Sequence, residues 1–356
     1  MATPDVPVPI DRLLLFGERL LARAGVPDED ARLTSRILVE ADLRGVESHG
    51  VAHLVDFYVR RIQRGEVDPR PNVRVTSDAA SAATLDGGRG LGFVVGHRAM
   101  SLAIEKARET GIGFVAAGNS THYGAGAYYA MMALEHDMVG VSMTTGGRMM
   151  AVPGGHERIL GLNVLAVAAP TSRPFPYVLD MATSVVAAGK FEVARRRGRP
   201  VPEGWAVDGD GRPITDPSRL DARAALLPLG GTPEHGAYKG FGLTMMVDIL
   251  TGGLSGFGTS AEVDTVRGVS HAFAALRIDA FLPAAEYRER MEPMIEAIKR
   301  SRTDSGEEVR IPGELEHALA DERRSAGVVP VHRDIVAGFR DAAAELDVSF
   351  DLTDEA

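Results

Sequence analysis

The sequence contains no cysteine, which removes several kinds of chemistry at once. A chain without thiols forms no disulfide bond, binds no zinc through thiolates and has no cysteine nucleophile. This composition fits the reducing environment of the cytoplasm. Aromatic residues are also scarce, at 6% of the 356 residues, whereas glycine occurs 40 times. So much glycine predicts many tight turns and close backbone approaches, which α/β and α+β enzymes use around small ligands.

Long apolar runs and dense positive charge are missing too. The longest apolar stretches, residues 164–170 and 243–250, are too short or too interrupted by charge to span a membrane. Residues 1–10 are rich in proline and lack the basic and apolar regions of a signal peptide. The formal net charge is −10, and the one dense basic group, residues 195–197 with Arg199, is typical of a solvated helix end. We therefore predict a cytoplasmic protein without nucleic-acid or membrane partners.

The remaining composition, 45% hydrophobic and 25% charged, is that of a globular protein with room for two domains. Apolar residues at three- and four-residue spacing predict helices, and β-branched runs bounded by turn residues predict strands. Helices are expected over residues 10–24, 28–43, 54–64, 94–109, 126–135, 184–197, 240–250 and 284–300, and again from residue 313 onward. Strands are expected over residues 113–117, 139–144, 164–169 and 177–179, with one more after residue 273. A mostly helical beginning is thus followed by a sheet-containing middle domain.

Two glycine-rich strings, residues 111–116 and 256–261, match the letters of the dinucleotide fingerprint Gly-x-Gly-x-x-Gly/Ala. In that fingerprint a strand precedes the glycines and a helix follows them, so that the pyrophosphate lies at a helix N-terminus. Both strings instead follow a predicted helix, and the first one opens a strand. Neither a P-loop lysine motif nor a nucleophile-elbow serine replaces them. An ordinary Rossmann site is therefore not expected.

Ser48 and His49 place a hydroxyl group beside an imidazole, directly before Gly50. The imidazole can give or take a proton near neutral pH, and the hydroxyl can orient the ring or a substrate oxygen. On local evidence alone, His49 is equally well explained as a structural histidine near a helix end. His53 lies four residues later, but Gly50 weakens a helix between the two and no glutamate completes a zinc-protease pattern. No metal site is therefore predicted.

Three further segments combine polar residues with turns beside apolar strands. His122 lies at a strand-to-helix junction, where ligands commonly bind, although it could instead cap the helix. Asp180 ends an apolar strand and could orient an imidazole, but capping of the following helix is the favoured local interpretation. Lys239 stands in a glycine-framed turn before a helix, which suits a phosphate group and equally an ordinary surface loop.

Taken in order, these segments resemble the malate/L-lactate dehydrogenase family, which also contains L-sulfolactate, ureidoglycolate and diketogulonate oxidoreductases and cyclic-imine (piperideine-2-carboxylate) reductases. The resemblance extends from about residue 10 to residue 338. Its motifs are DLRG at 42–45, SHG at 48–50, NSTHYG at 119–124, GGHE at 154–157, GLN at 161–163, LDMATS at 179–184, GK at 189–190, PEGWA at 202–206, LPLGG at 227–231, YKG at 238–240 and IPGE at 311–314.

The resemblance implies an α/β (mixed α+β) fold of the L-sulfolactate dehydrogenase type, which binds a nicotinamide cofactor without a Rossmann fingerprint. A helical dimerisation domain would consist of residues 1–75 and 283–356, and an α/β domain that binds cofactor and substrate would consist of residues 76–282. The resemblance also implies a homodimer and either NAD or NADP as cofactor. Candidates for the choice between NAD and NADP are Lys190, Arg173 and residues 195–197.

In the family, the histidine that matches His49 is the general acid that protonates the carbonyl or imine site, and the residues that match Ser48 and Asp180 form its relay. The histidine that matches His122 lies in the substrate pocket, and some members assign the proton transfer to it. The family's cofactor contacts fall on three segments. They correspond here to Pro176, Tyr177, Val178, Leu179, Asp180, Met181 and Ala182, to Tyr238, Lys239 and Gly240, and to Gly313, Glu314 and Leu315.

The sequence departs from the family where the substrate carboxylate is held. Many members place an arginine four residues after the catalytic histidine, and this chain has His53 there. A neutral imidazole cannot form the bidentate, charge-assisted pair of an arginine, so either Arg44, Arg148 or another cation replaces it, or the substrate differs. The expected substrate-binding residues are therefore Arg44, His53, His122, Thr144 and Arg148.

We therefore predict an NAD(P)-dependent dehydrogenase that transfers a hydride between nicotinamide and C2 of a small 2-hydroxy or 2-oxo acid. His49 would move the matching proton, and Asp180 would stabilise its charged form. Reduction of a cyclic imine carboxylate is the alternative within this class of enzyme. Outside the class, the alternatives are a non-catalytic ligand-binding relative and a metal-dependent lyase or hydrolase.

Overall fold

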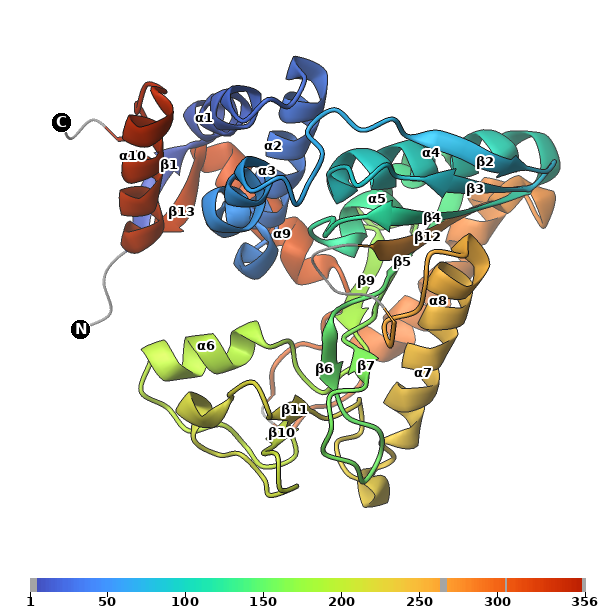
Figure 1. Cartoon of the computed structure of the whole chain (residues 1–356). Coiled ribbons are helices and arrows are strands. Elements are labelled where there is room, and N and C mark those ends of the chain that lie inside the picture. The colour runs from blue at the N-terminus through green and yellow to red at the C-terminus, as the bar shows by residue number, and fades with distance from the viewer. Residues whose placement is uncertain (1–4, 263–267, 305, 354–356) are drawn as a thin grey trace.

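The computed structural model describes residues 5–262, 268–304 and 306–353, so the outermost residues of the expected helical domain, 1–4 and 354–356, lie outside the described residues. A helical part built from both ends of the chain lies beside a seven-stranded sheet, with a smaller sheet below (Figure 1). The expectation of a mixed α/β fold is confirmed. Within the described part of the chain, each helix is too short or too polar to reach across a lipid bilayer.

The helical part begins with the hairpin of α1 (Ile10–Arg23) and α2 (Asp28–Leu43), as the spacing of apolar residues predicts. Their inner faces share one core with α3 (Arg60–Gln63), α9 (Glu314–Ala326) and α10 (Arg333–Leu346). Leu13 and Leu20 of α1 and Phe339 of α10 are almost completely buried there. This core therefore joins residues more than 300 positions apart.

The two ends of the chain are also joined by strands. The first strand, β1 (Asp5–Pro9), pairs antiparallel with β13 (Val328–His332), which lies between α9 and α10. The prediction of helix throughout the region after residue 313 is wrong over β13. Helix α9 ends because Gly327 adopts φ +71°, a left-handed conformation that glycine adopts without strain. The chain then becomes extended and finds a partner in β1.

The large sheet is mixed, and its strand order is β2-β3-β4-β12-β5-β8-β9. Only β3 and β4 run parallel. Its strands are β2 (Arg74–Asp78), β3 (Ala82–Asp86), β4 (Ile112–Ser120), β5 (Met138–Thr144), β8 (Val164–Ala169), β9 (Tyr177–Ala182) and β12 (Val269–Arg277). The predicted strands at 113–117, 139–144, 164–169 and 177–179 are confirmed within this sheet, and β12 is the additional one.

Helices α4 (Gly92–Thr110) and α5 (Gly126–Met132) cover one face of this sheet. They approach it closely because Gly113 of β4 and Gly140 of β5 have no Cβ: a methyl group at either position would overlap a carbonyl oxygen of the covering helix. Gly111 ends α4 in a left-handed conformation. The glycines of residues 111–116 thus serve a helix end and close packing, which explains why the fingerprint pattern fails there.

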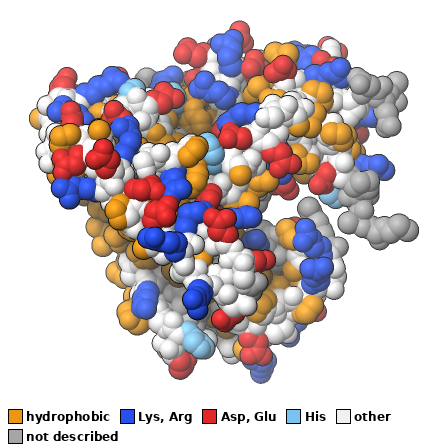
Figure 2. Space-filling view, turned by 180° about the vertical axis from the view of Figure 1, so that it is seen from behind, with side chains coloured by type: hydrophobic (Ala, Val, Ile, Leu, Met, Phe, Trp, Pro, Cys, Tyr) orange, Lys and Arg blue, Asp and Glu red, His pale blue; other side chains and the backbone are white. Residues whose placement is uncertain are grey.

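The opposite face of the sheet is covered by α7 (Tyr238–Asp248), which continues as a π-helical turn over Ile249–Gly253. Below it, a small sheet has the order β10-β11-β6-β7. Its short strands are β6 (Arg148–Met150), β7 (Leu160–Gly161), β10 (Ala206–Val207) and β11 (Ala225–Leu226). Figure 2 shows acidic and basic side chains interspersed over the rear face of the molecule.

Two helices differ from their expected limits or neighbours. The helix expected over residues 184–197 begins only at Gly189, as α6 (Gly189–Arg196), because the N–H of Val185 bonds to the carbonyl of Leu227 at 2.9 Å. Helix α8 (Ala284–Lys299) begins at the expected residue, but its ion pairs join it to Asp137 and Arg173 beside the sheet. The division of the chain at residue 283 stays a prediction.

Candidate active site

The segment around His49 is a sequence of short turns held by Asp42. Helix α2 ends at Leu43, and two 3₁₀ turns follow, Glu47–His49 and Val51–His53. Asp42 is 3% exposed, and its carboxylate accepts the N–H of Val51 at 2.7 Å, at the junction of the two turns. Burial raises the pKa of Asp42 to about 8, although the Val51 hydrogen bond acts in the opposite direction. A buried acid thus fixes the loop that carries His49.

Beyond His53 the chain forms a π-helical turn over Leu54–Val59 and then α3, where one helix was expected over residues 54–64. The wider turn lies one residue after His53 and contains Phe57 and Tyr58. Such π turns are often found at functional sites. Here the turn brings both aromatic rings against His122, at centroid distances of 5.2 Å and 6.1 Å.

Three imidazole rings meet at this place, although the sequence separates them by up to 73 positions. His122 follows β4, and its ring stacks on that of His49 with the centroids 5.6 Å apart. The ring of His53 lies 6.4 Å from both, nearly perpendicular to them. The sequence-predicted residues His49, His53 and His122 therefore form one cluster.

Hydrogen bonds orient the members of the cluster. The hydroxyl of Ser48 lies 3.0 Å from Nδ1 of His49, as the proton-transfer hypothesis expects. The ring of His53 bonds to the backbone of Ser48. The hydroxyl of Tyr58 lies 2.7 Å from Nδ1 of His122. Tyr58 was not predicted from the sequence, where nothing connects it to a histidine 64 positions away.

The surroundings keep all three rings neutral at physiological pH. Burial lowers the pKa of His49 to about 4, and the neighbouring His53 acts in the same direction. Burial likewise lowers the pKa of His53, and it lowers that of His122 well below the usual range. A neutral imidazole has a lone pair available, so the cluster is suited to accept a proton from a substrate hydroxyl.

His49 lines a cavity of about 540 Å³ between the helical part and the edge strand β9. Ten of the sequence-predicted site residues line it: Arg44, Ser48, His49, Val178, Leu179, Asp180, Met181, Ala182, Gly313 and Leu315. Lining residues that were not predicted are Val46, Gly124, Ala125, Gly126, Ala127, Leu162, Val164, Ala187, Arg310, Ile311, Pro312 and Glu316. Two distant motifs, SHG and LDMATS, therefore open into one space, as their joint assignment to a site requires.

Asp180 faces this cavity, but its hydrogen bonds go to the start of α5. Its carboxylate accepts the N–H of Ala127 at 2.8 Å and a backbone bond from Gly126. The expectation that Asp180 caps the helix that follows it is therefore wrong, because its bonds go to α5, which precedes it in the sequence. The surrounding protein raises the pKa of Asp180 to about 6, against the effect of these bonds and of Arg44. No direct bond joins Asp180 to His49 among the described residues.

Arg44, which follows the last residue of α2, is the most buried cation of the cavity. It is 7% exposed, and burial lowers its pKa despite the nearby carboxylates of Glu40 and Glu316. No carboxylate of the described residues lies within 4 Å of its guanidinium. A buried guanidinium without an ion pair carries a desolvation cost that an anionic ligand would offset. Arg44 is therefore positioned to bind an anion.

The other expected substrate contacts, His53, His122, Thr144 and Arg148, are not among the residues that line this cavity, although the two histidine rings contact His49, which does line it. Arg148 is exposed on β6, and Thr144 is 6% exposed at the end of β5. The hydroxyl of Thr144 bonds to Nδ1 of the buried His271 at 2.8 Å, and Nε2 of His271 lies 3.0 Å from the hydroxyl of Ser120. This bridge ties three strands together next to the histidine cluster.

The expected cofactor segments are divided between the cavity and its surroundings. Gly313 fits closely against β9, because a Cβ there would come within 2.8 Å of Val178. The carboxylate of Glu314 is occupied by Lys299 at 2.6 Å and by the N–H of Ile311 at 3.0 Å. Residues that do not line the cavity are Pro176, Tyr177, Tyr238, Lys239, Gly240 and Glu314. Gly240 touches the end of β9 through the backbone of Thr183.

Two of the candidates for reading the adenosine ribose already form ion pairs within the protein. Arg173 forms ion pairs with Glu292 and Glu296 of α8, and Arg195 pairs with Glu192 at 2.5 Å. Lys190 is exposed at the start of α6.

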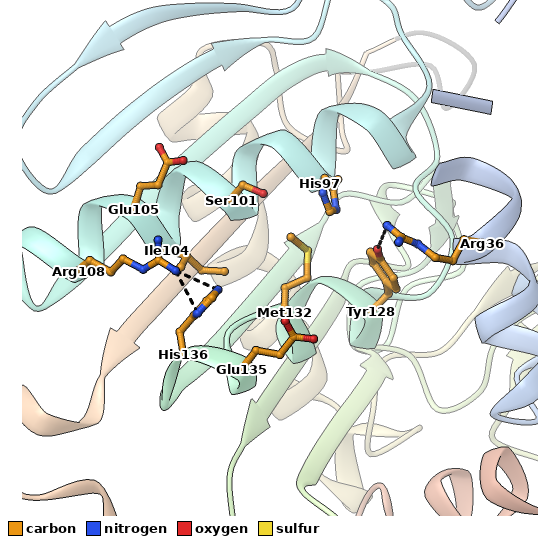
Figure 3. A pocket seen from close by; sticks show the side chains of 10 residues that line it. All are labelled: Arg36, His97, Ser101, Ile104, Glu105, Arg108, Tyr128, Met132, Glu135 and His136. Carbon is orange, nitrogen blue, oxygen red and sulfur yellow. Dashed lines mark hydrogen bonds between the residues drawn. The ribbon is translucent and has the colours of Figure 1, made fainter. Parts of the chain in front are cut away.

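A second cavity, of about 430 Å³, lies between α2, α4 and α5, away from every predicted site residue (Figure 3). Arg36 donates to the hydroxyl of Tyr128 at one end, and Arg108 bonds to the ring of His136 at the other. No group of three or more acidic or histidine side chains in the described part of the chain is arranged to hold a metal ion. The candidate active site is therefore the cavity beside His49.

The lining of that cavity suits a nicotinamide nucleotide. Leu162, Val164 and Leu179 offer apolar contacts for a ring. The exposed guanidinium of Arg310 is available for a phosphate group.

Comparison with known proteins adds independent support. A model of the malate/L-lactate dehydrogenase family matches residues 8–340. A malate dehydrogenase from Pyrococcus horikoshii is 46% identical over 347 residues, covering 96% of both chains. The solved malate dehydrogenase structure from P. horikoshii has a TM-score of 0.89 at 43% identity, with 97% of both chains covered.

Two further relatives extend the range of reactions. An L-sulfolactate dehydrogenase from Methanocaldococcus jannaschii is 37% identical over 307 residues, which are 83% of this chain and 85% of that protein. A solved Δ1-piperideine-2-carboxylate reductase from Pseudomonas syringae pv. tomato has a TM-score of 0.84 at 26% identity, covering 95% of this chain and 100% of the other. With both the expected family and the expected fold type confirmed, the chain belongs to the malate/L-lactate dehydrogenase family and is a nicotinamide-dependent oxidoreductase that acts on CH–OH groups.

Proposed function

We propose that this protein transfers a hydride between NAD or NADP and C2 of a small 2-hydroxy or 2-oxo acid, and that His49 moves the accompanying proton. The observation that carries the proposal is the position of His49. Its neutral ring lines the cavity, is bonded to Ser48 and stacks on His122. A base that is neutral and accessible from a cavity is the arrangement that removal of a hydroxyl proton requires.

The chemistry divides into two transfers. A nicotinamide held against Leu162, Val164 and Leu179 would supply the acceptor for the hydrogen of C2 and its electron pair. The hydroxyl proton goes to His49 as the C2–O bond becomes a carbonyl, and the reverse reaction returns both. Ser48 orients the ring, and the carboxylate of Asp180 in the same cavity favours the charged imidazolium that forms.

We propose Arg44 as the anchor of the substrate carboxylate. It lines the same cavity as His49, is buried and has no ion pair among the described residues, whereas Arg148 is exposed on β6. His53, which stands where many members have an arginine, contributes a neutral donor or acceptor beside His49. One buried arginine, Arg44, together with a neutral His53 favours a small acid that is held by a single carboxylate.

The test is a titration with NADH and NADPH, followed by assays of 2-oxo acids, including oxaloacetate, pyruvate and sulfopyruvate, with the preferred nucleotide. We expect at least one acid to be reduced, and His49→Ala to lower turnover by roughly 10²- to 10⁴-fold with nucleotide affinity unchanged. Undiminished turnover in His49→Ala would show that another group moves the proton.

Reduction of a cyclic imine carboxylate is the second candidate, favoured by the similarity to the P. syringae reductase and by the absence of an arginine at position 53. The same hydride and proton geometry serves both reactions. Adding Δ1-piperideine-2-carboxylate to the assay separates them, because a higher kcat/KM for the imine than for every oxo acid would reverse the order of the two candidates.

We also propose that the protein forms a homodimer through the outer side of α7, which belongs to the expected α/β domain and not to the helical dimerisation domain that the resemblance implies. The apolar side chains of Tyr238, Met245, Ile249 and Leu254 are 65%, 43%, 59% and 54% exposed, on a helix whose other side already covers the sheet. A helix that is apolar on all sides is normally covered on all sides. A second copy of the chain offers the same apolar surface, so that a two-fold axis buries both.

Light scattering on the purified protein tests the dimer directly. We expect a dimer mass for the wild type and a shift towards the monomer in Ile249→Glu. Val75→Glu is the control, because Val75 is 52% exposed on β2, far from α7, and should leave the mass unchanged. A monomeric wild type would refute the proposal. The cytoplasmic location suggested by the composition stays a prediction.

A further inference from the structure

Tyr58 contacts His122 from an element that is distant in the sequence. It is 2% exposed in the π-helical turn, and its hydroxyl lies 2.7 Å from Nδ1 of His122. The ring itself packs edge-on against Phe93 with the centroids 4.9 Å apart. The position of the ring is thus fixed by packing, and the hydroxyl is directed at a single polar atom.

The hydrogen bonds at Nδ1 determine which nitrogen of His122 carries the proton. The backbone N–H of Gly124 also donates to Nδ1, at 3.3 Å. Because a backbone N–H can only donate, Nδ1 is the unprotonated nitrogen and the hydroxyl of Tyr58 donates to it as well. Burial, together with His49 and His53, holds the pKa of His122 well below its usual range, so the ring is neutral. Its one proton is therefore on Nε2.

We propose that Tyr58 is a positioning residue that holds His122 in its Nε2–H form, so that His122 donates a hydrogen bond to the substrate oxygen and leaves proton acceptance to His49. The inference rests on the proposed function, and it assigns different roles to two stacked histidines. With Nδ1 occupied and Nε2 protonated, His122 has no free lone pair with which to act as a base. Its N–H stabilises the negative charge that develops on the oxygen at C2 during hydride transfer.

The experiment compares Tyr58→Phe with Tyr129→Phe. Tyr129 is a buried tyrosine whose hydroxyl donates to the carbonyl of Tyr123 at 2.6 Å, so its replacement also removes one buried hydroxyl but leaves His122 untouched. Histidine-labelled protein is studied by long-range ¹H–¹⁵N correlation spectra between pH 5 and 8, and the signals of His122 are identified by their loss in His122→Asn. Turnover, the dissociation constant for NADH and thermal stability are measured in parallel.

We expect the wild type to show an unprotonated Nδ1 and a protonated Nε2 at His122 throughout this pH range. In Tyr58→Phe only the longer bond from Gly124, at 3.3 Å, remains at Nδ1, so the other tautomer should become partly populated. We expect kcat to fall about tenfold while NADH binding is kept, which corresponds to the loss of about one hydrogen bond. Tyr129→Phe should keep the wild-type tautomer and turnover.

A protonated Nδ1 in the wild type would overturn the assignment, and so would an unchanged tautomer and turnover in Tyr58→Phe. Failure of the proposed function has a different signature: the tautomer would be as expected, but His49→Ala would remain fully active.

Discussion

The carboxylate of Asp42 lies directly against the α-carbon of Gly50, one residue after His49. A methyl group at Gly50 would overlap both carboxylate oxygens, while the same carboxylate accepts the N–H of Val51. The glycine of the Ser-His-Gly motif is therefore required by a neighbour that is eight positions away in the sequence. Its backbone conformation, with φ −94°, is one that any residue adopts, so the requirement is steric.

Gly50→Ala should consequently destabilise the protein by about 1–3 kcal/mol, the usual cost of overpacking, and should lower turnover by displacing His49. Urea unfolding and kcat measure the two effects. Gly338→Ala is the matched control, because Gly338 is exposed in α10 and a Cβ there meets nothing within 4 Å. That variant should be as stable as the wild type or more stable by up to about 1 kcal/mol. Equal stability of the two variants would contradict a steric role of Asp42.

The low pKa of His49 predicts opposite pH dependences for the two directions of the reaction. Oxidation needs the neutral ring, which predominates above the pKa of about 4, so kcat/KM for oxidation should lack an inflection near pH 6.5. Reduction needs the protonated ring, whose fraction falls tenfold per pH unit above that pKa, so kcat/KM for reduction should decline steadily from pH 5 to 8. Initial rates in both directions check this. Because the pKa of Asp180 in the same cavity is raised to about 6, the profiles are also measured in Asp180→Asn, and a midpoint near 6.5 that persists there would contradict the depressed pKa of His49.

Arg44→Gln should raise KM for the acid by about 10- to 100-fold, which corresponds to one charge-assisted hydrogen bond of about 1.5–3 kcal/mol. Nucleotide affinity should change little, because the anchored group belongs to the substrate. Arg148→Gln provides the comparison, since Arg148 is exposed and outside the cavity lining. If instead Arg148→Gln raises KM and Arg44→Gln does not, the exposed arginine is the anchor.

His53→Arg tests whether position 53 selects the carboxylate. A guanidinium there would lie beside His49 and could form the bidentate pair that an imidazole cannot. We expect malate or lactate activity to appear or to increase relative to the wild type, measured as kcat/KM on each acid. An unchanged ranking of substrates would mean that a guanidinium at position 53 adds nothing to the anchor that we propose at Arg44.

Because His271 is buried, we expect the free energy of unfolding to decrease in acid. Burial lowers its pKa from 6.5 to about 3, so the unfolded chain binds more protons between these values and stability falls as the pH falls through that range. In this range the free energy of unfolding changes by up to about 1.4 kcal/mol per pH unit because of His271. Above pH 6.5 the ring is neutral in both states, and the free energy of unfolding no longer depends on its titration. His271→Gln should be less stable than the wild type at pH 7, because the bridge between Ser120 and Thr144 is lost. In urea unfolding the difference in the free energy of unfolding between the two proteins should narrow at pH 5, and a constant difference would mean that folding does not lower the pKa of His271.

The sequence allowed the fold to be predicted where local patterns are long. Helix α2 and strands such as β5 and β8 have periodic apolar faces, and their observed limits agree with the expected ones. Strand β13 contains Pro330 and is only five residues long, so its state is decided by its pairing with β1 at the other end of the chain. The two-residue strands of the small sheet are too short to carry a period at all.

Part of the lining of the candidate cavity could be expected from the sequence, but the connections between its residues could not. His49 and Asp180 were both expected, and both line the cavity. The sequence could not show that Asp180 bonds to the amides of α5, which lie more than 50 positions earlier. The sequence also could not show that Tyr58 contacts His122. That contact depends on a π-helical turn, and the spacing of apolar residues predicts an ordinary α-helix there. A contact that forms only when two elements pack together cannot be predicted from the residue pattern of either element alone.

The pairing of β1 with β13 also sets an order for folding during synthesis. Residues 5–9 leave the ribosome first, but their partner strand is complete only when residue 332 has been made. Until then the helical hairpin that leads to His49 lacks Val329, Phe339 and Leu352 from its core. The active-site loop is thus made early and stabilised late, and a chain truncated before residue 328 should be degraded or aggregate instead of retaining a partly active site.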